Sequence, residues 1–573
     1  MQISGTTGED LARGTRRRKL IVWILVSLLV VGGPVLFVVQ KPWRLKKLQQ
    51  AAQEAMKRGD LMAASFNARR ALQIDPDFVP ACVTMAEIGE HNRVSDAVIW
   101  REKVLRLAGE SGDTLLGLAS SALRFGKVFT ARAALDRVPP KDREREDFLV
   151  LSGAMALESK DYVEAVRLYE AAIQLHPGKA EYRFALGMAK CASDDSLTRE
   201  EGRRLLLDLS SHETLGAAAV RAVIANCEAH QEKQAALRYA KQLQTMSTRK
   251  VSDDVLLLRL MRNTNDEKFP DELASAQQKA LSDRKYAGAL LLWMSGDGLA
   301  KDGLRWVQER NPKLGQSPEL RPAIAGCYLT LMNWDALLAI TGKGEWDAVE
   351  YVRHAYRSKA FREKPERSLA STEWDLAVNA ANGQIEALSW LAQMAAEWKW
   401  LDENVQTLWA VLNKAPESRW AIEALQKSYL ERNDTPGLRR VALHLVKIDP
   451  ANDNAKNDFA LASLLLNTET DRATKMARDL YTKHPENAAF NSTYAFAMHL
   501  TGRTAEGIEI LEKLPPKTLE EPAIAAYYGV MLAANYAPEK ASRYLEISRR
   551  ANLLREEKDL VAQAEQSLAR PNN

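Results

Sequence analysis

Apolar and small side chains recur at spacings of three and four residues along most of the chain, which is the spacing of one face of an α-helix. The clearest stretch, 146–177, predicts two short helices around a turn at 160–162. Their shared face is formed by Leu149, Ser152, Gly153 and Ala156 on the first helix and by Ala165, Tyr169 and Ala172 on the second. Pro177 is predicted to end the second helix, because proline cannot continue one.

Gly153 and Ala165 are small enough to let the two helix backbones approach closely. A helix pair of this length cannot bury its apolar face by itself, so stacked neighbours of the same kind are expected. The glycine, the tyrosine at the turn, the two alanines and the closing proline resemble, in register, a tetratricopeptide repeat. The resemblance implies an all-α superhelix of helical hairpins, a solenoid whose concave groove binds protein or peptide ligands.

The repeat pattern predicts a helical array with three consecutive parts. Hairpins are regular over 45–195, lose their regular spacing over 196–384 and recover it over 385–555. We interpret 196–384 as degenerate repeats, and a separate helical domain is the alternative. Residues 556–573 are charged and predict a capping helix, whose polar face would cover the open end of the array, followed by a short tail.

Proline spacing sets the repeat length in the C-terminal part. Pro416 and Pro450 lie 34 residues apart, and Pro485 follows 35 residues later. This register predicts that one repeat starts at Arg419 and another at Ala488. In tetratricopeptide proteins the second, fifth and ninth positions of the first helix face the groove, so the resemblance implies candidate binding residues at these positions.

The candidate binding residues form two sets. Trp420, Glu423 and Lys427 hold these positions in the first repeat, and Ser492, Phe496 and His499 take comparable positions in the second. A large aromatic side chain beside fixed charges is a plausible anchor site for a peptide or a glycan. Trp420 belongs to a tryptophan-rich stretch whose other members are predicted to pack between helices: Trp374, Trp390, Trp398, Trp400 and Trp409.

The N-terminus predicts a membrane anchor. A short basic tail over 1–19 precedes the uncharged run from residue 20 to residue 39, and a helix of this length spans about 30 Å, the thickness of a hydrocarbon core. Trp23 and Trp43 suit interfacial positions. A cleaved signal peptide is the alternative, but its apolar run is shorter and ends at a small-residue cleavage site. We therefore predict an uncleaved transmembrane helix over 20–40.

Basic residues on both sides of this helix bear on its orientation. Arg16, Arg17, Arg18 and Lys19 precede it, and Lys41, Arg44, Lys46 and Lys47 follow it. The tighter cluster on the short tail favours an N-terminus inside and a translocated body under the positive-inside rule. In a bacterium this places the anchor in the inner membrane and the body in the periplasm, and a cytosol-facing body is the alternative.

Length and composition agree with a folded array. At 573 residues the chain is too long for one ordinary core, and 46% apolar with 27% charged residues argues against wholesale disorder. Residues 1–60 hold eleven Lys and Arg against four Asp and Glu, a balance of +7, so the net charge of +4 leaves −3 for the remainder. A nearly neutral body gives no electrostatic reason to expect nucleic acid as a partner.

The sequence carries no motif that predicts catalysis, and neither a cofactor nor a metal is expected. The metalloprotease, nucleophile-elbow and phosphate-loop motifs are all missing. The four cysteines form no Cys-x-x-Cys pair and are interpreted as buried helical thiols: Cys82, Cys191, Cys227 and Cys327. An enzyme whose site is assembled from distant repeats is therefore the weakest of three interpretations.

The first interpretation is a membrane-tethered scaffold of a bacterial envelope, similar to anchored tetratricopeptide proteins that organise assembly, secretion or polysaccharide-export complexes. The second is a cytosol-facing anchored receptor or regulator. Family members that bind chaperones use a clamp of Lys, Asn and Arg, whereas the first repeat here offers Lys46, Gln49 and Gln53. The missing clamp weakens the second interpretation, and neither interpretation identifies the partner.

Overall fold

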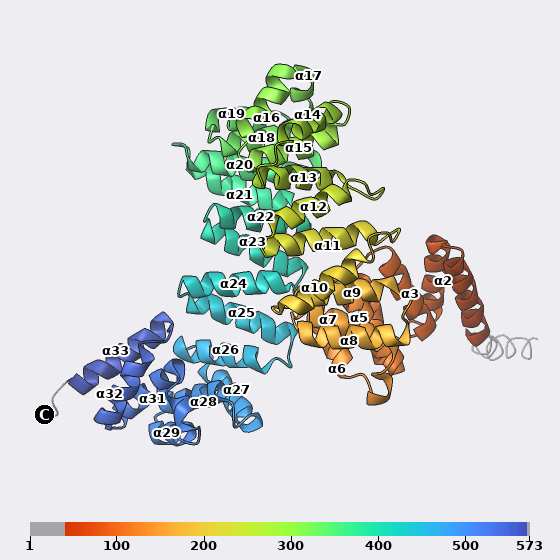
Figure 1. The fold of residues 1–573 in the computed structure, drawn as a ribbon. Coiled ribbons are helices and arrows are strands. Elements are labelled where there is room, and N and C mark those ends of the chain that lie inside the picture. Colours follow the sequence, from red (N-terminus) through yellow and green to blue (C-terminus); the bar gives the residue numbers. More distant parts are fainter. Residues whose placement is uncertain (1–40, 570–573) are drawn as a thin grey trace, which may run out of the picture. The chain divides into compact units, whose positions relative to one another are not determined.

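The computed structural model describes residues 41–569, and every regular element among them is a helix (Figure 1). The predicted tail over 1–19 and the predicted anchor over 20–40 lie outside the described residues. Within the described part, no helix combines the length and apolar character needed to cross a membrane. The chain divides into two compact units between Leu175 and His176, and each is described separately below. The all-α prediction is confirmed for the described part.

The first unit is a series of antiparallel helical hairpins. It begins with a helix over 41–57, which is followed by α2 (Leu61–Ile74), α3 (Val79–His91), α4 (Asp96–Ala108), α5 (Gly112–Arg124), α6 (Val128–Asp136), the short η1 (Pro140–Asp142), α7 (Glu146–Glu158) and α8 (Tyr162–Leu175).

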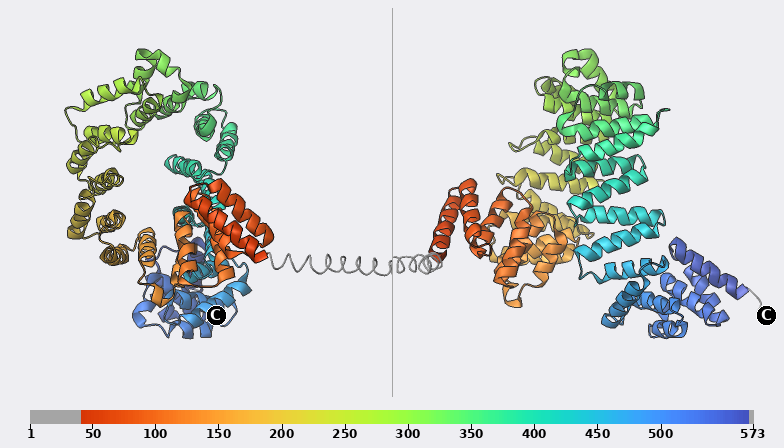
Figure 2. Two further views of the ribbon diagram at one scale, coloured as in Figure 1. Left: turned by 90° about the vertical axis from the view of Figure 1, so that its right-hand side faces the viewer. Right: turned by 180° about the vertical axis from the view of Figure 1, so that it is seen from behind.

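The second unit continues the hairpins, which follow one another from yellow through green to blue (Figure 2). Its first part, which holds the short and irregular elements, comprises α9 (Ala180–Cys191), α10 (Ser196–Leu207), α11 (Gly216–Ala229), α12 (Lys233–Leu243), α13 (Val251–Asn263), α14 (Phe269–Ala280), α15 (Arg284–Gly296), α16 (Ala300–Leu304), the π-helical η2 (Arg305–Arg310), α17 (Pro312–Gly315), η3 (Pro318–Leu320), α18 (Arg321–Thr330), α19 (Trp334–Thr341), η4 (Asp347–Val349), α20 (Glu350–Arg362) and α21 (Ser368–Ala380).

Its remaining helices are longer and more evenly spaced: α22 (Ile385–Glu397), α23 (Leu401–Lys414), α24 (Arg419–Glu431), α25 (Thr435–Ile448), α26 (Asp453–Leu465), α27 (Thr470–Lys483), α28 (Ala488–Leu500), α29 (Thr504–Leu511), α30 (Pro516–Leu519), α31 (Pro522–Ala534), α32 (Pro538–Ser548) and α33 (Arg555–Ala569). Pro416, Pro450 and Pro485 each lie two residues beyond the end of α23, α25 and α27, where the sequence predicts the helices to stop.

A left-handed residue marks the turn inside most hairpins, and within three runs it recurs every 33 to 35 residues. In the first unit these residues are Gly59, Arg93, Gly126 and Lys160, and in the second they are Gln231, Asn265, Gly298 and Met332, followed later by Lys399, Asn433, Asn467, Gly502 and Tyr536. A residue with positive φ turns the chain and lets its amides bond to the last carbonyls of a helix, as the amide of Asp161 does to Ala156 at 2.9 Å. The same interval therefore runs from 231 to 332, inside the region where the sequence spacing is irregular.

The hairpin of α7 and α8 shows how side chains fill such a unit. Leu149, Gly153 and Ala165 are buried as predicted, whereas Ser152 is only partly buried. A Cβ built on Gly153 would meet Tyr169 ring atoms at 2.9–3.2 Å. The glycine is needed because the tyrosine ring occupies the space where its side chain would lie.

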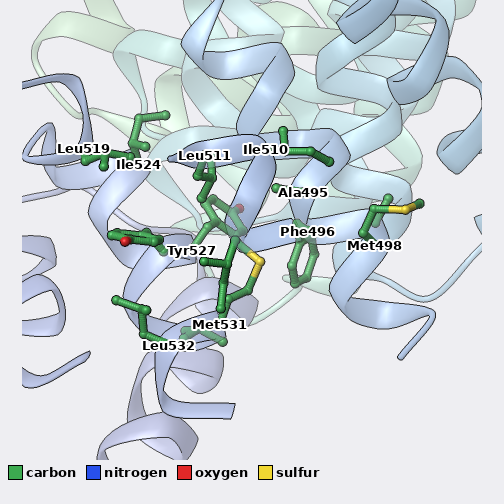
Figure 3. Packing of buried hydrophobic residues seen from close by; sticks show 14 of the residues in the cluster. Ala495, Phe496, Met498, Ile510, Leu511, Leu519, Ile524, Tyr527, Met531 and Leu532 are labelled. Atoms are coloured by element: carbon green, nitrogen blue, oxygen red, sulfur yellow. The ribbon is translucent and has the colours of Figure 1, made fainter. Parts of the chain in front are cut away.

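Buried side chains form successive clusters along the array. Each helix packs mainly on the helices before and after it, and separate clusters of buried residues follow one another in chain order. The cluster around α28, α29 and α31 is the last of these (Figure 3). Local cores of this kind are the arrangement expected of a solenoid, in which each unit is stabilised by its neighbours.

Candidate functional site

The candidate site lies on α24, which begins at Arg419 as the repeat register predicts. Trp420, Glu423 and Lys427 are spaced by three and four residues, so they share one face of this helix. All three side chains are exposed, and 43% of the Trp420 surface is accessible. Leu430, which the sequence analysis did not select, continues the same face and is 48% exposed.

We call these four residues the α24 stripe: an indole at one end, an isobutyl group at the other and two charges between them. The Arg419 guanidinium pairs with the Glu423 carboxylate at 2.7 Å. The Lys427 ammonium lies 3.9 Å from the Glu431 carboxylate, at the outer limit of an ion pair, and its side chain is 78% exposed. The stripe therefore offers water-accessible apolar ends and a weakly held cation, which suit an extended or helical peptide with a carboxylate.

The second predicted set does not form an exposed surface, and that prediction is wrong for two of its three residues. Ser492 and Phe496 are 4% and 1% exposed. Tyr527 from α31 packs on the Phe496 ring with 5.0 Å between centroids, which explains why the ring is buried (Figure 3). His499 is partly buried, burial lowers its pKa, and its Nδ1 lies 3.0 Å from the Thr504 hydroxyl.

The other tryptophans pack between helices, as predicted. Trp374 and Trp400 are buried and meet edge to face at 5.6 Å, and Trp398 and Trp390 are partly buried against neighbouring rings. Trp409 is partly buried. Its indole N–H donates to the Tyr429 hydroxyl at 2.9 Å, and the Arg440 guanidinium lies 3.9 Å from its ring centroid. Trp409 is therefore held by packing, in contrast to Trp420.

A charged cluster between α26 and α27 escaped the sequence analysis. The Asp453 carboxylate accepts hydrogen bonds from Lys456 at 2.9 Å, Lys483 at 2.5 Å and His484 at 2.9 Å. Burial alone would raise the pKa of Asp453, but these three donors outweigh it and hold the pKa far below its usual range. The three donors are spread over about 30 residues of sequence, so no local motif reveals them.

The first unit carries an apolar hollow of about 1050 Å³ between α2, α3 and α4. Met62 and Phe66 on α2 are 85% and 60% exposed, and Trp100 on α4 lines the other side. No sequence motif predicts this hollow, because its residues come from three helices and carry no charge pattern.

Neither the thiols nor the acidic side chains suggest a metal site. The four cysteines are buried and free, as predicted. Across residues 41–569, no three His, Cys, Asp or Glu side chains are grouped so that they could hold a metal ion.

No protein-family model matches the chain, and no curated protein sequence matches it. Similar solved structures include the following three. A crystal structure of MamA protein shares 18% identity, covers 30% of this chain and 94% of its own, and has a TM-score of 0.26. The APC/C hetero-tetramer Cut9-Hcn1 shares 13% identity over 94% of this chain and 99% of its own, with a TM-score of 0.26. A tetratricopeptide repeat protein from Parabacteroides merdae ATCC 43184 shares 12% identity over 50% of this chain and 99% of its own, with a TM-score of 0.25.

Proposed function

We propose that this chain is a protein–protein interaction scaffold of the tetratricopeptide type, which binds a partner segment through the α24 stripe. The observation that carries the proposal is the exposure of Trp420, at 43%, next to the weakly paired Lys427. The other five tryptophans of the region are buried or partly buried. An indole that is left in water, with charges beside it, is the residue type that most often anchors a protein interface.

The finer part of the proposal is a location. The scaffold is tethered to the inner membrane of a bacterium by residues 20–40, with its body in the periplasm, where it organises an assembly, secretion or polysaccharide-export complex. What supports this part is the uncharged run of residues 20–39 and the basic cluster before it.

The test is capture of partner proteins from detergent-solubilised membranes by the full chain and by Trp420→Ala. Truncating an aromatic anchor in a desolvated contact commonly costs about 2 kcal/mol. Trp420→Ala should therefore bind the partner with ~30-fold lower affinity and capture less of it. Thermal stability should change little, because the side chain is largely in water.

Two controls accompany this variant. Tyr536→Ala removes an aromatic side chain that is 89% exposed and lies off the stripe, so it should capture partners like the wild type. Trp409→Ala loses the Tyr429 hydrogen bond and should lower stability before it affects capture. If Trp420→Ala captures the same proteins in the same amounts, the α24 stripe is not the binding surface.

A further inference from the structure

The helix α31 is buried along most of its length. All ten residues from 524 to 533 are buried, whereas Ala523, at the position of Trp420, is exposed. Counted from the start of each helix, Ala526 and Val530 take the positions of Glu423 and Lys427. They are 3% and 8% exposed, whereas Glu423 and Lys427 face water. Another element therefore covers the part of α31 that corresponds to Glu423 and Lys427 of the α24 stripe.

The covering element is α33, the last described helix. It packs mainly on α31 and less on α32, the helix that directly precedes it. The Tyr527 hydroxyl on α31 donates a hydrogen bond to the Glu557 carboxylate. The apolar side of α33 joins the cluster around α31 through Leu560, Val561, Ala564 and Leu568. The sequence predicts a capping helix over this segment, and α33 packs its apolar side mainly on α31.

The start of α33 also reaches back along the array to α25. The buried Thr435 hydroxyl donates a hydrogen bond to the Glu556 carboxylate, 121 residues further along the chain. Stacking of consecutive hairpins does not bring such residues together, since each hairpin touches its neighbours. Contacts with both α25 and α31 therefore show that α33 lies across several hairpins, as a bound helical ligand would.

The release of α33 would leave the hairpins in place. Only Ala564 of this helix is buried, and no other described helix follows it. In an array, opening a terminal element costs its own contacts and leaves the other units standing.

We propose that α33 is a resident ligand of the array, and that an amphipathic helix of another protein binds the same face of α31 when α33 leaves it. The pattern of α33 defines the class of ligand. The Glu557 carboxylate in its first turn accepts a hydrogen bond from Tyr527, and apolar side chains follow three, four, seven and eleven residues later. We expect the partner helix to carry the same pattern. The inference rests on the proposed scaffold function and specifies the chemical class of a partner.

The probe is a fluorescent peptide with the sequence of residues 553–569, and its binding to the full chain is measured by fluorescence anisotropy. In the wild type the tethered α33 competes at an effective concentration of about millimolar, so the peptide should bind weakly. Val561→Asp places a carboxylate on the apolar side of α33 and should lower the apparent Kd of the peptide by at least ~10-fold. Ala562→Asp adds the same charge at an exposed neighbouring position and should bind like the wild type.

A peptide that itself carries Val561→Asp keeps the assay independent of the folding of any variant, and it should not bind. Hydrogen exchange of the Val561→Asp chain should show lost protection in α31 and unchanged protection in α24 to α28. Loss across all of these helices would make α33 a structural staple and overturn the proposal. Equal peptide binding to Val561→Asp and Ala562→Asp would overturn it too.

Two further outcomes separate the possible occupants and the two proposals. A wild-type dimer that the peptide dissociates would mean that a second copy, and not another protein, supplies the helix. Trp420→Ala should leave peptide binding unchanged, because Trp420 lies on α24. If the peptide fails to bind while capture still depends on Trp420, only the inference about α33 is overturned.

Discussion

At the residue scale, the structure depends on small side chains placed where a neighbour needs the space. Gly153 lies against the buried Tyr169 ring, and Gly178, in the loop after α8, has no atom within 4 Å of a built Cβ. These two glycines therefore play different roles, although the sequence shows only that both are glycines.

Gly153→Ala should destabilise the hairpin of α7 and α8 by ~1–3 kcal/mol, because the new methyl group would lie 2.9 Å from a Tyr169 ring carbon that is packed in place. Gly178→Ala is the matched control and should be nearly neutral. Hydrogen exchange of the amides in α7 and α8 measures both effects. Equal protection in the two variants would show that the tyrosine ring moves aside freely.

Asp453 carries a prediction about pH. Its folded-state pKa is held below the unfolded value, so its contribution to stability is present above about pH 4 and is lost as the pH falls through the folded pKa. Asp453→Asn should weaken the packing of α26 on α27 by ~1–3 kcal/mol at pH 7, and the difference from wild type should shrink in acid. Asp479→Asn is the control, because Asp479 on α27 lines the same small hollow between α26 and α27 as Asp453, and it should show neither effect. The measurement is the hydrogen-exchange protection of α27 amides in the wild type and both variants from pH 7 to pH 3.

At the scale of elements, the hairpin is the unit of stability. Its turn residue recurs every 33 to 35 positions, its two helices pack on each other, and its buried face is completed by the next hairpin. Helix lengths are irregular from α16 to η4, but the turn residues Gly298 and Met332 keep the same interval as in the regular hairpins. Damage to one hairpin should therefore stay local.

Ala165→Leu tests this locality. Ala165 is fully buried in α8, and overpacking a close contact costs about 1–3 kcal/mol. Amides of α7 and α8 should exchange faster, and those of α22 to α28 should keep their wild-type rates. A uniform loss of protection along the chain would mean that the array unfolds as one cooperative body.

At the scale of the whole molecule, membrane attachment is the property to test. We expect residues 1–40 alone to hold the chain in the membrane, so a variant that begins at Leu45 should be recovered in solution with its helices intact. Arg44, Lys46 and Lys47 each add about 1 kcal/mol of surface attraction that salt screens, so the fractionation includes a high-salt wash.

If the shortened chain still partitions into washed membranes, residues 1–40 are not the anchor. A reporter fused after Asn573 separates the two orientations, since we expect activity only on the translocated side. Activity in the cytosol would favour the receptor interpretation.

The sequence by itself determined the helices, their pairing into hairpins and the register that places Trp420 on an exposed face. It could do so because helix periodicity, helix-ending prolines and small residues act over a few residues, within one repeat. It also separated the packed tryptophans from the exposed one, since the repeat position decides which side of a helix meets the next hairpin.

Only the tertiary structure decided which repeat positions stay open. Phe496 and Val530 hold positions equivalent to that of Lys427, yet both are buried. Tyr527 packs on Phe496, and α33 packs on the helix that carries Val530. The Asp453 cluster and the contact between Thr435 and Glu556 likewise join residues from 3 to 121 positions apart. The longer of these contacts depend on how helices lie against one another, and the periodicity of a single helix carries no information about them.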